Sequence, residues 1–258
     1  MSGARIAWIS MTPVKGLALE LPDEVELVEE GVRGDRRFFL VDERNRLVNN
    51  MGRRSPLELV HSDYDEGTNV LTLRLSGGRV LSGPAEQTDK LTVTFHRKTR
   101  PARRVPGPWD SKLSELAGEP VRLVAGERAA PDRGLGGAAT LLATASLGAL
   151  AQELGVDRID PRRFRMNFGI EGLEPHAEDG WTGRRVNVGD AVVVPQGHVG
   201  RCAITKQNPD TGLSDLDTLN AIARYRGELD LTEPLPFGVH AAVVEPGRVR
   251  VGDAVTLL

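Results

Sequence analysis

Apolar and polar residues alternate with a period of two in many short segments of the chain. Leucines occupy every second position of 71–75, and the segment 91–95 repeats the pattern with leucine, valine and phenylalanine. This period is typical of strands that bury one face. Gly-Asp at 34–35 and Gly-Gly at 77–78 are spaced as turns in an antiparallel structure. The first half is therefore predicted to form a small barrel or sandwich.

Three other segments place apolar residues three or four positions apart, which is the period of a helix with one buried face. They cover residues 111–117, 144–154 and 214–226. The predicted N-caps are Ser111, Thr144 and a capping box of Ser214 with Asp217, and the predicted ends are Gly155 and Gly227. Few helices among many strands predict a β-rich α+β fold.

One short sequence occurs twice, because Val-Asn-Val-Gly-Asp-Ala-Val at 186–192 returns as Val-Arg-Val-Gly-Asp-Ala-Val at 249–255. Each copy is predicted to form a strand, a tight turn and a strand. Glycine gives the turn its backbone freedom, and aspartate gives it a local hydrogen bond. The repeat supports a barrel and carries no binding role.

Length and charge narrow the class of protein. The 258 residues, 40% of them hydrophobic, suffice for one large β-rich domain or two small ones. Helix- and strand-breaking residues and charged residues are frequent at 125–137, so we divide the chain into domains 1–125 and 126–258.

A net charge of −3 argues against a protein that coats nucleic acid. No stretch approaches the roughly 18 apolar residues of a membrane span, so we expect a cytoplasmic protein without nucleic-acid or membrane partners.

Cys202 is the chain's single cysteine. One thiol cannot close an internal disulfide, complete a four-cysteine zinc site or hold an iron–sulfur cluster. A lone cysteine is usually a small buried hydrophobic residue. Here, however, Arg201 adjoins it, and a neighbouring cation favours the thiolate, the form that binds metals. Gly200 also leaves room for a ligand close to the backbone.

Three basic residues and one asparagine are candidates for binding an anion. Arg165 and Asn167 would share one face if the segment 161–168 were a strand, and arginine grips phosphate through two hydrogen bonds. Lys15 and Arg36 could reach the same anion from the amino-terminal part. The alternative for the first pair is a solvated charge run beside an apolar strand, and for the second pair separate surface charges.

These motifs together resemble the MOSC family, and the resemblance extends along nearly the whole chain. The segments that carry it are Pro13–Gly16, Gly34–Arg36 followed by Phe39–Val41, Phe164–Asn167, Arg201–Cys202, Pro209–Gly212 and Val251–Val255. In this family, which includes mitochondrial amidoxime-reducing enzymes and bacterial relatives, a β-barrel domain precedes a MOSC β-barrel with a few short helices. The resemblance implies the same architecture here.

The resemblance also implies a molybdenum–pterin cofactor, with Cys202 as the protein's ligand to the metal. Soft thiolate ligands suit such a metal. The matching cofactor-binding side chains are Lys15, Arg36, Arg165, Arg201 and Asn167. Where relatives commonly have hydroxyl groups, this chain has glycines, namely Gly16, Gly136, Gly137 and Gly200. Their backbone amides can still donate hydrogen bonds to a phosphate or a pterin.

The activity that the resemblance implies is the reduction of small N-hydroxylated molecules by oxygen-atom transfer. The cofactor performs the redox step, and Asp210 is a candidate for delivering the proton, although its Pro-Asp-Thr-Gly motif is also typical of a turn. Without an iron–sulfur cluster the electrons must come from a separate donor protein. The basic run 96–104 could dock an acidic carrier, or it could be a charged loop between strands.

Three alternatives remain beside this prediction. Gly-Leu-Gly-Gly-Ala-Ala at 134–139 fits a loose nucleotide-binding pattern, but the residues after it are predicted to form a strand instead of a helix. The fold could instead serve as a sulfur carrier at Cys202, as in the sulfurases whose larger chains also contain a pyridoxal phosphate domain. A MOSC fold recruited to a biosynthetic reaction is the third.

Overall fold

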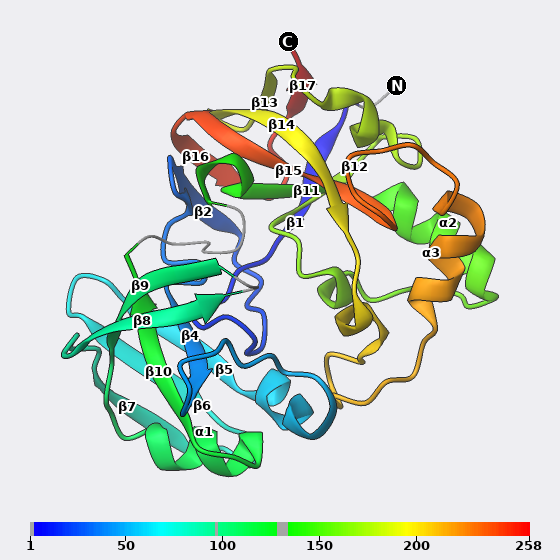
Figure 1. Cartoon of the computed structure of the whole chain (residues 1–258). Helices are drawn as coiled ribbons and strands as arrows, with labels where there is room; N and C mark the ends of the chain where they lie inside the picture. The colour runs from blue at the N-terminus through cyan, green and yellow to red at the C-terminus, as the bar shows by residue number, and fades with distance from the viewer. Residues whose placement is uncertain (1–2, 96–97, 128–133) are drawn as a thin grey trace.

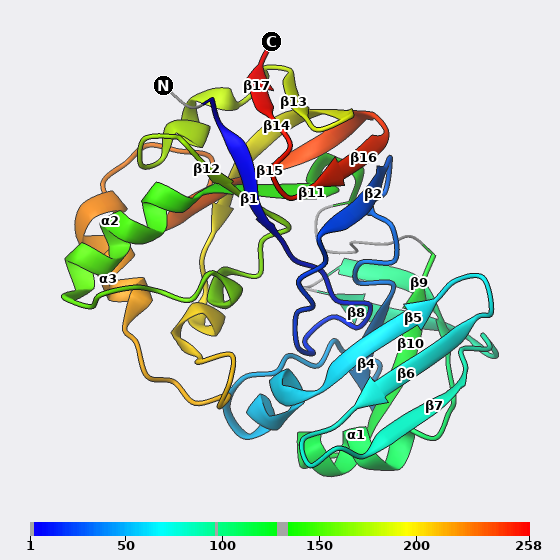
Figure 2. The same cartoon turned by 180° about the vertical axis from the view of Figure 1, so that it is seen from behind.

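The computed structural model describes residues 3–95, 98–127 and 134–258, and these form two lobes (Figures 1 and 2). The large-sheet lobe contains a seven-stranded sheet and the two longer helices. The small-sheet lobe contains a four-stranded and a three-stranded sheet with one α-helix. This strand-rich arrangement confirms the predicted α+β fold.

The seven-stranded sheet of the large-sheet lobe is nearly closed. Its strands follow the order β1 (Arg5–Ile9), β12 (Phe168–Glu171), β11 (Ala139–Ala143), β15 (Pro236–Glu245), β14 (Ala191–Gly200), β13 (Val186–Val188) and β17 (Val255–Leu257). The chain beside β17 meets β1, because Ile6 N donates to Asp253 O at 2.9 Å and Val255 N donates to Ala4 O at 2.9 Å. These bonds bring the two edges together, and closure is how a barrel avoids exposed strand edges.

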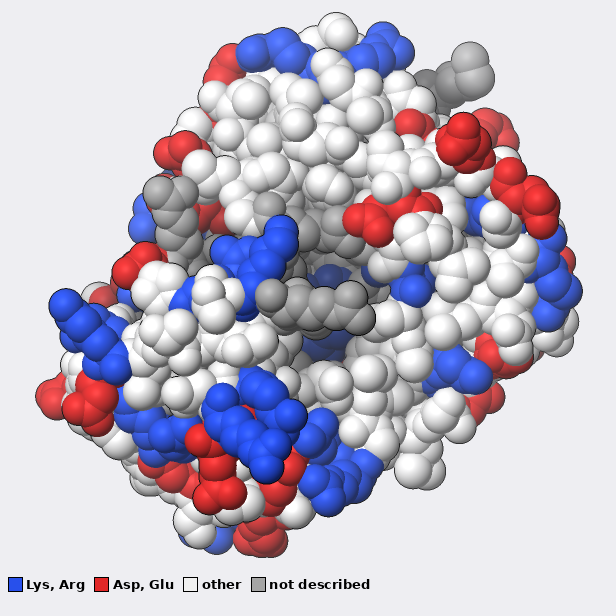
Figure 3. Space-filling view, in the orientation of Figure 1, with Lys and Arg blue, Asp and Glu red and all other residues white. Residues whose placement is uncertain are grey.

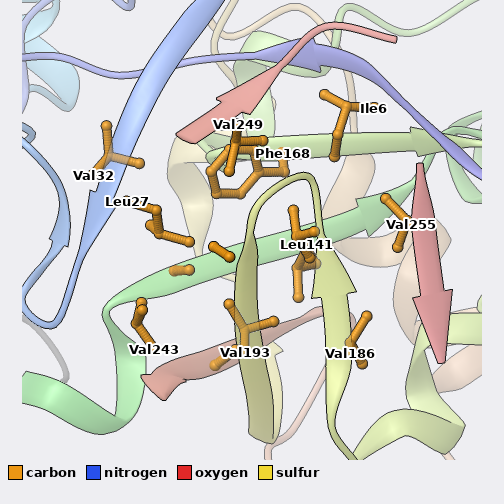
Figure 4. Close-up of a cluster of buried hydrophobic side chains, with 14 of the residues drawn as sticks. Ile6, Leu27, Val32, Leu141, Phe168, Val186, Val193, Val243, Val249 and Val255 are labelled. Carbon is orange, nitrogen blue, oxygen red and sulfur yellow. The ribbon is translucent and has the colours of Figure 1, made fainter. Parts of the chain in front are cut away.

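A three-stranded sheet and several helices complete the large-sheet lobe. The sheet consists of β16 (Gly247–Arg250), β2 (Glu24–Val28) and β3 (Gly31–Val32). The helices are α2 (Thr144–Leu154), α3 (Thr218–Arg226) and the 3₁₀ segments η2 (Gly134–Gly137), η3 (Pro161–Phe164), η4 (Ala177–Trp181) and η5 (Ala203–Lys206). Figure 4 shows the core between the two sheets, where Leu27 and Val32 come near Leu141 and Val249.

The small-sheet lobe has a core of its own. Its four-stranded sheet runs β4 (Phe38–Asp42), β10 (Val121–Gly126), β9 (Lys98–Arg104) and β8 (Lys90–Phe95), and its three-stranded sheet runs β5 (His61–Asp65), β6 (Val70–Arg74) and β7 (Val80–Pro84). The helix α1 (Asp110–Ala117) and the 3₁₀ segment η1 (Gly52–Leu59) contact each other beside them. The predicted period-two strands are confirmed, since Leu71, Leu73, Val93 and Phe95 are buried.

The three predicted helices exist, and Gly155 and Gly227 are the C-caps of α2 and α3 as predicted, but the predicted N-caps are wrong. No side chain caps α1 or α2, whose N-cap residues are Trp109 and Ala143. The third helix begins only at Thr218, so the capping box of Ser214 with Asp217 does not form. Gly155 does end α2 in the left-handed conformation that glycine adopts without strain.

The two copies of the repeated sequence have different partners. In the first copy β13 and β14 form an antiparallel hairpin. In the second copy the flanking strands belong to different sheets, because β16 pairs with β2 whereas β17 pairs with β13. The prediction of strand, turn and strand holds for both, yet only tertiary pairing decides which copy is a hairpin.

The chain crosses between the lobes four times. Ile9, Val25 and Val32 belong to the large-sheet core, whereas Val14, Leu17, Phe38 and Ala125 belong to the small-sheet core. The crossings are therefore residues 10–13, 18–24, 33–37 and 126–137, of which 128–133 lie outside the described residues. The division at 125/126 stays a prediction, and strands pair across it, since β1 pairs with β12 and β2 with β16.

Within the described part of the chain, no helix is both long and apolar enough to cross a membrane.

Candidate functional site

A cavity of about 440 Å³ lies where the chain crosses between the lobes. The face seen in Figure 3 is hollowed there, and lysine and arginine atoms lie inside the hollow. Nine of the predicted site residues line this cavity: Lys15, Gly16, Arg36, Gly137, Arg165, Asn167, Gly200, Arg201 and Cys202. Residues far apart in the sequence thus share one cavity.

The crossings 10–13 and 33–37 are bonded to each other, which fixes Lys15 and Arg36 beside the cavity. Lys15 N donates to Phe38 O at 2.8 Å, and Phe38 N donates to Pro13 O at 2.9 Å. Arg36 N donates to Thr12 O at 2.7 Å. Because both segments satisfy each other's backbone groups, they can pass between two cores without leaving polar atoms buried and unpaired.

Arg36 and Arg165 both have left-handed backbones, with φ of 51° and 53°. Residues other than glycine rarely adopt this backbone conformation, and those that do cluster at functional sites. In Arg165 it ends η3 and turns the chain towards β12. The segment 161–168 is therefore not one strand, because η3 and this turn come first and β12 begins at Phe168. The turn still leaves Arg165 and Asn167 on one cavity wall.

A buried hydrogen-bond network stands behind these arginines. The Asp35 carboxylate accepts from Thr12 N at 2.8 Å, from Asn167 Nδ2 at 2.9 Å and from the Arg36 guanidinium. The side-chain oxygen of Asn167 accepts from the Thr140 hydroxyl at 2.9 Å. Asp35 is 3% exposed, and a buried carboxylate needs such donors. Asn167 therefore ties the crossings to β11, and its role here is positional.

Burial outweighs charge attraction at Arg165. Its guanidinium lies 3.4 Å from the Glu58 carboxylate and donates to Leu17 O at 2.7 Å. Burial lowers the pKa of Arg165 to about 10, so the group remains positive at neutral pH. Burial likewise raises the pKa of Glu58, against the opposing effect of nearby arginines. The pair places a permanent cation at the cavity wall.

Arg201 and Cys202 follow directly on β14. Arg201 Nε donates to Phe237 O at 2.9 Å and Nη1 donates to Phe164 O at 2.9 Å, while its guanidinium lies 5.3 Å from the Phe164 ring. These contacts hold the chain as it leaves the sheet. Cys202 comes next, at the start of η5, and it is exposed. Its thiol is thus in a cavity with cations, and it is not packed in a core.

The opposite wall comes from the small-sheet lobe. Residues 47–51, between β4 and η1, line the cavity and face the end of β14. Lys15 lies near them, with Nζ 5.6 Å from the centre of the Phe95 ring. Gly16 has φ of 90°, a left-handed value that suits glycine. The cavity therefore requires both lobes.

Two predicted residues lie outside this cavity. Asp210 is mostly exposed, pairs with Arg162 at 2.9 Å and lines a second cavity of about 540 Å³. Arg165 lines both cavities and stands between them. Gly136 lies next to the cavity-lining Gly137, with its carbonyl 2.9 Å from His240 Nδ1.

The basic run 96–104 falls partly outside the described residues, because 96 and 97 are not among them. The remainder is β9, paired on both sides. Arg103 donates to Thr88 O at 3.2 Å, and Arg104 forms an ion pair with Asp110. These internal contacts favour the alternative of a charged structural segment.

The structure argues against the nucleotide-binding alternative for the reason predicted from the sequence, namely that a strand follows the glycines. Residues 134–137 form η2, and the strand β11 follows them where a helix N-terminus would be needed to hold a pyrophosphate.

Sequence reasoning missed several cavity residues. Asp35 and Thr140 both line the cavity. From the sequence, Asp35 was only a member of the Gly-Asp-Arg motif, and Thr140 was predicted only to belong to a strand. Asn50 carried no signal, since it lies in the segment 47–51 outside any motif. A residue type alone does not reveal which buried groups are partners.

The cavity's chemistry is that of a site for an anion with a soft-metal ligand nearby. Four cationic side chains and one carboxylate line it, namely Lys15, Arg36, Arg165 and Arg201 against Asp35. In the described part of the chain no three ligating side chains gather around a possible metal. A metal here would need most of its ligands from a bound cofactor, with Cys202 as the soft donor.

Comparison with known proteins identifies the fold family. The profile of the MOSC domain matches residues 132–256. The mitochondrial amidoxime-reducing component 1 of Mus musculus is 38% identical over 107 residues, which are 39% of this chain and 31% of that protein. The molybdenum cofactor sulfurase of Solanum lycopersicum is 28% identical over 113 residues, 42% of this chain and 13% of that protein.

A solved structure, the YUAD protein of Bacillus subtilis, aligns with a TM-score of 0.46 and 12% identity over 98% of this chain and 93% of that one. The matched segment spans less than a third of the length of the amidoxime-reducing relative. Residues 132–256 therefore match the MOSC domain, and part of the chain is similar to an amidoxime-reducing component.

Proposed function

We propose that the chain is an oxidoreductase that binds a molybdenum–pterin cofactor in the cavity between its lobes. The observation that carries this proposal is the placement of an exposed thiol, Cys202, in one cavity with four cations. A cofactor that brings both a thiophilic metal and a phosphate needs these two kinds of group. The names of the relatives, an amidoxime-reducing component and a molybdenum cofactor sulfurase, point to the same cofactor.

The residues would divide the work as follows. Cys202 would be the protein's ligand to molybdenum, and Lys15 and Arg36 would attract the phosphate, with Arg165 and Arg201 adding positive charge. Asn167 would hold Asp35 and so keep Arg36 in place. Gly16, Gly137 and Gly200 leave backbone close to the ligand. When bound, the cofactor would supply two-electron oxygen-atom transfer.

The proposed substrates are small N-hydroxylated molecules, and the electrons would come from a separate donor protein. The part of the cavity that the bound cofactor does not fill would limit the size of the substrate. Gly200 contributes no side chain there, although its space is bounded, because an added Cβ would lie 2.9 Å from Pro234 O. The space at Gly200, next to Cys202, is therefore limited by the Pro234 carbonyl and the Glu233 side chain.

Metal analysis with two variants tests the proposal. Purified wild type should contain near-stoichiometric molybdenum and reduce hydroxylamines or amidoximes with an artificial electron donor. Cys202→Ser should abolish turnover but keep pterin, since the cations remain, whereas Lys15→Ala should lower pterin content. Full activity of Cys202→Ser would refute the ligand assignment. Inactivity of the loaded protein towards hydroxylamines, amidoximes, N-oxides and sulfoxides would refute the substrate class.

A sulfur carrier is the second candidate, favoured by the exposure of Cys202 and the match to a sulfurase. Mass spectrometry separates it from the enzyme. A persulfide on Cys202 in protein without molybdenum would support the carrier, and an unmodified thiol in molybdenum-containing protein would support the oxidoreductase.

A further inference from the structure

The side-chain amide of Asn50 is a buried hydrogen-bond donor for which the described part of the chain provides no acceptor. The residue is 5% exposed and lines the cavity together with Lys15 and Cys202. Its Nδ2 atom has no hydrogen-bond partner among the described residues. A buried donor left unpaired costs folding free energy, so an unpaired donor on a residue that lines a cavity suggests an acceptor on a ligand.

A hydrogen bond to its backbone oxygen holds Asn50 in this position. Gln207 Nε2 donates to Asn50 O at 3.0 Å and to Gly212 O at 3.1 Å. Gln207 therefore joins the segment 47–51 of the small-sheet lobe to the segment that follows Cys202. On the other side Asn50 adjoins Gly16, where an added Cβ would lie 3.9 Å from the Asn50 Cβ. The amide thus sits between the lysine and the thiol segments.

The cavity's cations supply charge but have much of their hydrogen-bonding geometry committed to the protein. Arg36 donates to Arg165 O at 2.7 Å, Arg165 to Leu17 O and Arg201 to Phe237 O. The arginine N–H groups that already donate to the protein have little freedom to point at a ligand. A neutral amide with an unused N–H can donate a directional hydrogen bond to that ligand. The ligand that fits cations and a neutral donor together is an anion rich in oxygen acceptors.

We infer that Asn50 is a binding residue of this site, and that its side-chain amide donates a hydrogen bond to an oxygen of the phosphate-bearing pterin. The inference rests on the proposed function, because it takes the same cofactor as the ligand. It makes Asn50 a binding group that the folded protein keeps unpaired until the ligand arrives.

The test compares Asn50→Leu with wild type in two forms of the whole protein. One form comes from a host that makes the pterin, and the other from a host that cannot. Pterin per mole of protein is measured as its fluorescent oxidation product, and Tm is measured for both forms. Asn50→Leu removes the unpaired donor at similar side-chain volume. We expect its pterin-free Tm to equal or exceed wild type, its pterin content to fall at least threefold, and its Tm gain on loading to shrink.

A second variant and a control keep the outcomes apart. Asn50→Asp has the same shape but offers acceptors and a negative charge, so it should lose more pterin than Asn50→Leu. Unchanged pterin content in both variants would overturn the inference, as would a lower pterin-free Tm with normal loading, which would mark Asn50 as purely structural. Lys15→Ala is measured in parallel. If it too retains full pterin, the proposed function fails; if it alone loses pterin, only the role of Asn50 fails.

Discussion

Arg36 and Arg165 meet at the cavity wall, where Nη2 of Arg36 donates to the backbone oxygen of Arg165 at 2.7 Å. The two residues are 129 positions apart and both have left-handed backbones. The bond joins the crossing 33–37 to the turn before β12. Two sharp turns are thus held by one guanidinium, which explains how strained backbone persists on both sides of the site.

The buried Asp35 carboxylate, which pairs with Arg36, should contribute strongly to the free energy of unfolding. Asp35→Ala would remove the acceptor of Thr12 N and one of the two acceptors of Asn167 Nδ2, which also donates to Ser10 O at 3.3 Å, and each buried N–H left unpaired costs about 1–3 kcal/mol. Urea unfolding should show a loss of about 2–5 kcal/mol in the free energy of unfolding. Glu26→Ala, which breaks an ion pair that is about half exposed, is the control and should change it little. Equal losses for the two variants would contradict this reading.

Arg165 should stabilise the fold chiefly by neutralising Glu58. Arg165→Met leaves the Glu58 carboxylate, 2% exposed, without its partner, and breaking a buried pair in this way costs about 3–5 kcal/mol. Because burial already raises the pKa of Glu58, protonation should reduce the loss, so the variant should be less destabilised at pH 5 than at pH 8. Adding Glu58→Gln should restore much of the stability at pH 8. A pH-independent loss would rule out an unpaired charge as its cause.

Glu178 should make stability fall as the pH rises. Burial raises its pKa from 4.5 to about 7, so the folded state binds more protons than the unfolded state between these values. Its contribution is complete below about pH 4.5 and disappears as pH rises through about 7. With about 1.4 kcal/mol per pKa unit, the upper bound of this contribution is about 3.5 kcal/mol. Glu178→Gln is neutral throughout, so its advantage over wild type should grow from pH 4.5 to 8.

The comparison removes the opposite effect of His176, whose pKa burial lowers to about 4. That histidine is present in both proteins, so its contribution cancels in the difference. Parallel stability profiles of wild type and Glu178→Gln between pH 4.5 and 8 would show that Glu178 does not titrate in this way.

Two glycine substitutions should change stability in opposite directions. At Gly31, with φ of 126°, an added Cβ would lie 2.4 Å from Ala138 O beside the cavity, so Gly31→Ala should destabilise by at least the roughly 1–3 kcal/mol of overpacking. At Gly148, inside α2, nothing lies within 4 Å of an added Cβ. Gly148→Ala should stabilise the helix by about 0.5–1 kcal/mol. Thermal unfolding measures both, and a stabilised Gly31→Ala would disprove the close contact.

The sequence by itself determined the local elements and the types of group at the site. Alternation at 71–75 and 91–95 predicts strands because one face must be buried, and Gly155 predicts a helix end because glycine tolerates the left-handed turn. The family motifs named Cys202 and the four cations, since unusual residue types in fixed order are visible in the chain itself.

Only the tertiary structure decided which of these groups share a space. Lys15, Arg36 and Cys202 meet because the chain crosses between two cores, and crossings depend on strand pairing between distant segments. The same packing put Asp210 in another cavity and left Asn50 with an unpaired donor. Burial and partners are properties of contacts, so no residue carries them in its identity alone.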